Sequence, residues 1–241
     1  MQLFFLPHLN PEAIQAQKIE FTFDENESRH IAKSMRLKPG DVLNITDGAG
    51  FLYKGVIEEA DQRQTRVWIS EPHADKRLLT NKLHIAIAPT KNPDRIEWFV
   101  EKATEMGVDE ISLLSCEHSE RSRLKTERLE RIAIAALKQS GRSRLPLLHE
   151  TVDFERFLQQ KYAGEKYIAW CETDVEEHLL HKIKKGTDVI VLIGPEGDFS
   201  KEEADAAIAA GYQPVSLGRF TLRTETAGLT ACMLFHQANL E

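Results

Sequence analysis

Long apolar runs, paired cysteines and biased tracts are all missing from this sequence of 241 residues. No stretch approaches the roughly 18 to 20 uninterrupted apolar residues that a membrane span needs, and the first residues lack the basic region and cleavage site of a signal peptide. The three cysteines, Cys116, Cys171 and Cys232, are odd in number and far apart, which excludes a disulfide framework and a CxxC metal knuckle. With 41% hydrophobic residues, we expect a folded cytoplasmic protein of one to two domains.

The motifs of several common enzyme classes are also absent. The sequence contains no GxxxxGK[ST] phosphate loop, no early GxGxxG and no GxSxG, which argues against P-loop enzymes, Rossmann dehydrogenases and serine hydrolases. The nine histidines show neither HExxH nor HxxxH spacing, so we expect no metal. His118 and His149 flank a basic segment, and we interpret both as structural.

The charge is negative overall but unevenly distributed. The net charge of −7 argues by itself against a nucleic-acid-binding protein. Residues 118–146, however, contain eight basic and three acidic residues, whereas residues 147–210 contain seven basic and fourteen acidic ones. Because salt screens charges over about 8 to 10 Å, a local basic stripe can still bind phosphates. The alternative is a solvated helix face, and the sequence leaves both open.

The N-terminal part has the pattern of a small β-barrel. Short alternating segments separated by turns predict five strands, at residues 3–5, 19–23, 41–46, 53–59 and 65–70. One helix is expected at 26–35, and the polar segment 71–77 is predicted to be a linker. We therefore place the domain boundary between residues 1–72 and 73–241.

The larger C-terminal part alternates strands and helices, which predicts a parallel α/β sheet covered on both faces. The expected strands are 83–88, 110–114, 167–171, 189–193 and 214–217. The expected helices are 93–106, 126–140, 153–162, 174–185 and 200–210, with a further apolar helix through residues 229–234.

Two glycine loops follow strands of this part and are candidates for a small-molecule site. The apolar run 189–193 leads into Gly194-Pro195-Glu196-Gly197, after which Ser200 and Glu203 form a capping box at a helix start. The second loop runs from Gly218 to a helix start at Arg223-Thr224-Glu225, where free N–H groups favour anions. Ligands of open α/β sheets bind beyond the carboxyl ends of strands. The alternative is a pair of tight connections with purely local caps and ion pairs.

The two loops resemble the cofactor loops of the SPOUT methyltransferases. Within that superfamily they resemble the branch that methylates N3 of a uridine in bacterial small-subunit ribosomal RNA. The segments 102–108, 119–122 and 139–142 also match this branch. In the N-terminal half, Arg29-His30, Met35-Arg36, Gly40-Asp41, Asp47-Gly48 and Gly50 resemble its PUA-like RNA-binding domain. The sequence departs from the usual pattern at Phe220 and at Asp198, which replaces a common glycine.

The resemblance implies a fold and a cofactor. The fold would be α/β, with an N-terminal PUA-like β-barrel at 1–72 and a C-terminal SPOUT domain at 73–241 tied in a trefoil knot. S-adenosylmethionine would be the methyl donor, without any metal, and the family forms homodimers. The implied cofactor-binding residues are Leu192, Gly194, Pro195, Glu196, Gly197, Leu217, Gly218, Leu222 and Thr224.

The expected reaction needs a cation and a proton acceptor. Uracil N3 must lose a proton, and Arg223 is the candidate that stabilises the resulting anion. The general base is Glu225, Glu196 or solvent, and the sequence does not distinguish them. The partner would be 16S rRNA within the small ribosomal subunit, with no membrane involved. The candidate RNA-binding residues are Arg29, Arg36, Lys91, Arg121, Arg123, Arg142 and Arg144.

Two other functions remain open at this point. One is an RNA-binding or ribosome-assembly factor that has kept the fold without catalysis. The other is a ribose 2′-O-methyltransferase of the same superfamily.

Overall fold

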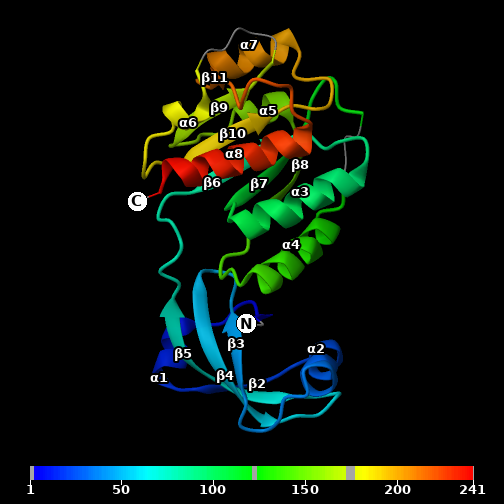
Figure 1. Ribbon diagram of the computed structural model, residues 1–241, viewed down its shortest axis with the longest axis vertical. Helices are drawn as coiled ribbons and strands as arrows, with labels where there is room; N and C mark the ends of the chain where they lie inside the picture. The colour runs from blue at the N-terminus through cyan, green and yellow to red at the C-terminus, as the bar shows by residue number, and fades with distance from the viewer. Residues whose placement is uncertain (1–2, 121–123, 172–176, 241) are drawn as a thin grey trace. The chain divides into compact units, whose positions relative to one another are not determined.

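The computed structural model describes residues 3–120, 124–171 and 177–240, and the chain divides into two compact units (Figure 1). The N-terminal unit comprises Met1–Leu78 together with Leu137–Leu145, and the C-terminal unit comprises Leu79–Ala136 and Pro146–Glu241. Among these residues, no helix combines the length and apolar character required to span a membrane.

A five-stranded sheet forms the N-terminal unit, in the order β1-β3-β4-β5-β2. Its strands are β1 (Leu3–Phe5), β2 (Ile19–Thr22), β3 (Val42–Thr46), β4 (Phe51–Glu59) and β5 (Arg66–Ala74). Strands β1 and β3 are parallel, and the other pairs are antiparallel. Alternate residues such as Ile45, Val67 and Ile69 are fully buried in one apolar cluster. The five predicted strands are confirmed.

The prediction of a linker at 71–77 is wrong for residues 71–74, and residues 75–77 lie outside any strand or helix. Strand β5 continues to Ala74, and Ala74 and His73 pair with Phe51 and Leu52 of β4. The polar residues here lie on an exposed strand end, where strand pairing needs no apolar side chains.

The helical parts of the N-terminal unit are short. The predicted helix at 26–35 is confirmed as α2 (Glu25–Arg29) followed by a π-helical turn, His30–Ser34. Helix α1 (Pro11–Ala16) was not predicted, although the residues at its start form a recognisable N-cap. The Asn10 side chain accepts hydrogen bonds from the N–H groups of Glu12 and Ala13, and Pro11 occupies the first turn.

The C-terminal unit is built on a parallel sheet of six strands in the order β11-β9-β10-β6-β7-β8. The strands are β6 (Leu83–Ile87), β7 (Glu110–Ser115), β8 (Leu147–Asp153), β9 (Glu165–Ala169), β10 (Val189–Ile193) and β11 (Gln213–Val215). All five neighbouring pairs are parallel, which confirms the predicted sheet type. Every residue of the central strands β6 and β10 is buried, as expected for strands covered on both faces.

Helices cover the two faces of this sheet (Figure 1). Helix α8 (Thr224–Ala238) packs on β6 and β10 and against α3 (Pro93–Met106). The other face carries α5 (Phe154–Leu158) and α7 (Lys201–Ala209), which share an apolar cluster with Ala86 and Leu192. Helix α4 (Thr126–Ser140) was predicted at the same residues, and its last turn belongs to the N-terminal unit.

Three predictions in the C-terminal part need correction. Edge strand β8 was not expected, because half-exposed polar residues such as His149 and Glu150 interrupt its apolar pattern. The helix predicted at 153–162 ends at Leu158 after starting at the Asp153 cap. Of the helix predicted at 174–185, residues 174–176 lie outside the described residues, and α6 covers Leu179–Lys182.

Candidate active site

A pocket of about 700 Å³ lies beyond the carboxyl ends of three adjacent strands, β9, β10 and β11. Because these strands are parallel, the segments that follow them lie along one edge of the sheet. The lining consists of residues 169–171, 193–198 and 215–224, together with Ala227. Its volume lies within the range of about 300 to 1,000 Å³ that is typical of small-molecule sites.

The first glycine loop is held in a tight conformation. A Cβ atom on Gly194 would lie 3.1 Å from the backbone N of Phe199, so a side chain there would be crowded. Asp198 adopts a left-handed conformation with φ +61°. Its carboxylate accepts hydrogen bonds from the N–H of Phe199 at 2.8 Å and from the N–H of Cys171 at 3.0 Å. These bonds explain how aspartate fits a position that favours glycine.

The second loop is tied to the first. The Ser216 hydroxyl donates to the carbonyl of Gly218 at 3.0 Å, and Gly218 itself has φ +149°, which favours glycine. Thr224, the first residue of α8, donates from its buried hydroxyl to the carbonyl of Gly194 at 3.1 Å. Arg223 precedes the helix, makes no capping hydrogen bond with its side chain, and lines the pocket. The two loops predicted from sequence therefore form one wall.

Arg95 lies between the two carboxylates that were candidates for the general base. Its guanidinium donates to Glu196 Oε1 at 2.5 Å, and its Nε lies 4.0 Å from Glu225 Oε1. Glu196 lines the pocket, whereas the Glu225 side chain is only 8% exposed and does not. Within the described chain, Glu225 Oε2 is buried without a hydrogen-bond partner. Sequence reasoning missed Arg95 because it stands in the first turn of α3, far from both loops along the chain.

His118 also contacts the first loop. Its Nδ1 lies 3.1 Å from the carbonyl oxygen of Asp198 and 3.2 Å from that of Gly197. Hydrogen bonding to the Asp198 carbonyl favours the protonated ring and raises the pKa of His118. The interpretation of this histidine as structural was based only on its isolation in the sequence, which carried no signal of the contact.

The structure brings most of the expected cofactor residues together. Eight of the nine line the pocket: Gly194, Pro195, Glu196, Gly197, Leu217, Gly218, Leu222 and Thr224. Leu192, a residue of β10, is fully buried in the core cluster, one residue before the lining begins at Ile193.

The expected RNA-binding residues are distributed over both units. Arg142 and Arg144 belong to the N-terminal unit, where Arg144 forms a strand bridge with Ala49. Arg29 is ion-paired with Glu25, and Arg36 is exposed with φ +57°. Lys91 belongs to the C-terminal unit and pairs with Glu120 at 2.6 Å. Arg121 and Arg123 lie outside the described residues.

The basic stripe at 118–146 is partly neutralised. Arg128 pairs with Glu97 at 2.6 Å, and Lys138 pairs with Glu27. These two ion pairs agree with the alternative prediction, that the stripe is a solvated helix face, because a carboxylate already balances each cation.

Comparison with known proteins connects this site to a family. A family model described as an RNA methyltransferase domain matches residues 77–236, and a model described as an RNA methyltransferase PUA domain matches residues 23–65. Ribosomal RNA small subunit methyltransferase E of Bacillus subtilis (strain 168) is 25% identical, over 96% of this chain and 94% of that protein. The protein of the same name from Synechocystis sp. is 28% identical, over 84% of this chain and 68% of that protein.

Solved structures agree with this assignment. The crystal structure of a probable rRNA-methyltransferase from Porphyromonas gingivalis is 39% identical, with a TM-score of 0.87, over 99% of this chain and 98% of that one. A Legionella pneumophila structure in complex with the bound cofactor SAM is 26% identical, with a TM-score of 0.84 and the same coverage. The chain, with its pocket between two glycine loops and its separate N-terminal sheet, therefore belongs to the RNA methyltransferase family that includes ribosomal RNA small subunit methyltransferase E.

Proposed function

We propose that this chain transfers the methyl group of S-adenosylmethionine to N3 of a specific uridine in 16S rRNA of the small ribosomal subunit. The observation that carries the proposal is the pocket at the carboxyl ends of β9, β10 and β11, with Arg223 in its wall. The names of the curated relatives support the small-subunit rRNA substrate.

The pocket fits the cofactor in size and in chemistry. A volume of about 700 Å³ accommodates a nucleoside with an amino-acid tail, and three glycines, Gly194, Gly197 and Gly218, line it. We assign the binding of S-adenosylmethionine to the lining residues of the two loops, with Leu192 supporting the first loop from the core. When bound, the cofactor supplies a methyl group that its sulfonium already activates for transfer.

The side chains of this chain then have to place and deprotonate the base. Arg223 stabilises the negative charge that develops on uracil as the N3 proton leaves. Of the two candidate carboxylates, Glu196 and Glu225, Glu196 lines the pocket, so we assign proton acceptance to Glu196 or to water beside it. Glu225, a catalytic candidate from the sequence, acts through Arg95 as a positioning residue, because its carboxylate is buried behind the wall. N3 is a Watson–Crick pairing atom, so the target uridine must be unpaired or flipped out.

Substrate binding and assembly complete the proposal. Residues 1–72, the PUA-like domain, hold RNA phosphates with Arg29 and Arg36, and residues 73–241 carry the catalytic site. Arg142 and Arg144, together with Lys91 and the arginines at 121 and 123, extend this binding. We infer that the protein acts in the cytoplasm as a homodimer. The dimer is supported by Trp98 of α3 and Met233 of α8, which are 45% and 49% exposed on two helices packed against each other.

Primer extension on 16S rRNA tests the target. In cells that carry the gene, reverse transcriptase stops at the methylated uridine, because N3 methylation blocks pairing, and cells that lack the gene show no stop. Identical stops in the two strains would refute the target. Nucleoside analysis of the product distinguishes base from ribose methylation, and calorimetry with S-adenosylmethionine excludes an RNA-binding factor that has lost the cofactor site.

A further inference from the structure

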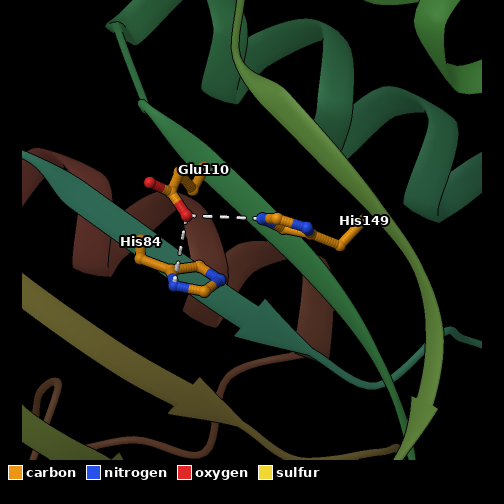
Figure 2. Close-up of side chains that lie close together, drawn as sticks. All are labelled: His84, Glu110 and His149. Atoms are coloured by element: carbon orange, nitrogen blue, oxygen red, sulfur yellow. Dashed lines mark hydrogen bonds and ion pairs between the residues drawn. The ribbon is translucent and has the colours of Figure 1, made fainter. Parts of the chain in front are cut away.

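Three side chains converge away from the pocket, on the sheet face that carries α5 (Figure 2). They are His84 of β6, Glu110 of β7 and His149 of β8, and Figure 2 shows both rings directed at the Glu110 carboxylate. One ligand atom from each lies within 4.8 Å of the other two. None of the three lines the methyltransferase pocket, since His84 and Glu110 stand at the amino-terminal ends of their strands.

We propose that His84, Glu110 and His149 bind one divalent transition-metal ion of the Zn²⁺ class. Two imidazoles and one carboxylate are a donor set that this ion favours, and three protein ligands leave a fourth position for water. The site is independent of the proposed methyl transfer.

The distances between the ligand atoms suit such an ion. Glu110 Oε2 lies 3.3 Å from His149 Nε2 and 3.8 Å from His84 Nδ1. Tetrahedral zinc with bonds of about 2.0 to 2.2 Å places its ligand atoms about 3.3 to 3.6 Å apart. All three ligand atoms lie within 4.8 Å of one another, so side-chain adjustments of up to about 1 Å bring them to this tetrahedral spacing.

The backbone holds the three ligands in place. In the parallel sheet, His84 is the register partner of Glu110, and His149 is that of Ser112. Three adjacent strands therefore present their ligands at fixed spacing, without the contribution of any loop.

His84 is oriented for metal binding. Its Nε2 lies 2.9 Å from the Ser112 hydroxyl, which leaves Nδ1 directed at the other two ligands. The ring packs edge-on against Phe157 at 5.9 Å, which holds it in this orientation.

Hydrogen bonding alone leaves this cluster incomplete. The separation of 3.8 Å between His84 Nδ1 and Glu110 Oε2 is too long for a hydrogen bond. The Glu110 and His149 side chains are 30% and 40% exposed, so an ion and its water ligand can reach the site from solvent. A bound metal would satisfy all three groups and would fasten edge strand β8 to β7 and β6.

The test is metal titration of the full-length protein after removal of metal with a chelator. Calorimetry with Zn²⁺ should show one equivalent bound, and Co²⁺ should give the intense visible absorption of a tetrahedral complex. Bound Zn²⁺ should also raise the melting temperature. Failure of the proposed methyl transfer would leave these readouts unaffected, since they do not depend on activity.

Variants locate the ion. His149→Ala and Glu110→Gln should each weaken Zn²⁺ binding more than about tenfold, and Ser112→Ala about tenfold, because second-shell partners orient the ligand. His178→Ala is the matched control, since His178 and His181 form a separate histidine pair with ring centroids 5.9 Å apart. Far-UV circular dichroism verifies that each variant is folded. Absence of one-to-one binding, unchanged binding in His149→Ala, or loss of binding in His178→Ala would each overturn the proposal.

Discussion

At the scale of single residues, the charge arrangement around Arg95 explains how two acidic side chains are kept beside a pocket that must also hold an RNA base. Arg95 donates to Glu196 and lies 4.0 Å from Glu225, so one guanidinium balances both carboxylates. Glu225 also stands in the first turn of α8, where the helix dipole favours a negative charge. Arg223, which lines the pocket together with Arg219, is the cation that we assign to the substrate.

Replacing Arg223 tests that assignment. In Arg223→Ala, the developing charge on the base loses its stabilising partner, and we expect kcat to fall about 100-fold, as for removal of one oxyanion donor. The affinity for S-adenosylmethionine should change little. Steady-state kinetics and calorimetry measure the two effects, with Arg156→Ala, an exposed arginine outside the pocket lining, as the control. A collapse of cofactor affinity with unchanged kcat would make Arg223 a binding residue instead.

The sequence predicted those site residues that are grouped along the chain. The loops at 194–197 and 217–224 follow recognisable strands, so their glycines and Arg223 could be placed from strand ends and helix starts. Arg95 and His118 reach the same loops from elsewhere in the chain, and their local sequence differs little from that of any helix surface or turn. The three ligands of the proposed metal site come from three separate strands, so no short spacing motif reveals them.

At the scale of elements, local signals predicted most helices and strands well. Caps such as Ser200 with Glu203, and runs such as Val189–Ile193, act within a few residues and can be read directly. Strand β8 was missed because it is stabilised by pairing with β7, through Glu110↔Leu147 and its neighbours, and not by its own apolar pattern. The length of α5 depends likewise on tertiary packing.

Helix α8 packs closely on α3 at Gly228, and a larger residue there should destabilise the protein. A Cβ atom on Gly228 would lie 2.5 Å from Phe99 Cε2 and 3.1 Å from Ile87 Cδ1, and both of these side chains are fully buried. Overpacking costs about 1 to 3 kcal/mol. Alanine recovers up to about 1 kcal/mol in helix propensity. We expect a net loss of about 1 to 2 kcal/mol in the free energy of unfolding of Gly228→Ala, measured by urea denaturation.

A compensating substitution serves as the control for Gly228→Ala. The double variant Phe99→Leu with Gly228→Ala removes the ring that the new Cβ meets. Its loss in free energy of unfolding should therefore be smaller than the sum of the losses of the two single variants. Strict additivity would show that Phe99 is not the residue under strain.

At the scale of the whole molecule, the N-terminal unit depends on a segment that returns from residues 137–145. Asp75 holds this segment, because it accepts hydrogen bonds from the Ser143 hydroxyl at 2.7 Å and from Arg77, which also donates to the carbonyl of Gly141. The hydrogen bonds from Arg77 and Ser143 hold the pKa of Asp75 well below its usual value.

The trefoil knot that the family resemblance implies for the C-terminal part stays a prediction.

The stability that Asp75 contributes should depend on pH. A carboxylate whose pKa is lower in the folded state stabilises the fold above its unfolded pKa of about 3.9, and the contribution is lost as the pH falls below that value. Asp75→Asn should therefore be less stable than wild type by about 1 to 2 kcal/mol at pH 7, and the gap should narrow at pH 3. Urea denaturation at both pH values measures it, with exposed Glu58→Gln as the control. A gap that stays constant with pH would contradict the ion-paired state.

The uneven charge of the whole chain makes the salt dependence of RNA binding the informative quantity. The net charge of −7 disfavours RNA binding, so binding must come from local cations. Each contact with a phosphate contributes about 0.7 to 0.9 to the slope of log K against log salt concentration. If Arg142 and Arg144 each contact a phosphate, Arg142→Gln with Arg144→Gln should lower that slope by about 1.5 and weaken binding at low salt. The double variant Arg63→Gln with Arg66→Gln removes the same charge from the N-terminal unit, where Arg66 already pairs with Glu59 at 2.7 Å. Because overall charge changes equally in the two double variants, equal slopes would show that only the net charge matters, whereas a drop confined to Arg142 and Arg144 would place phosphate at these two side chains.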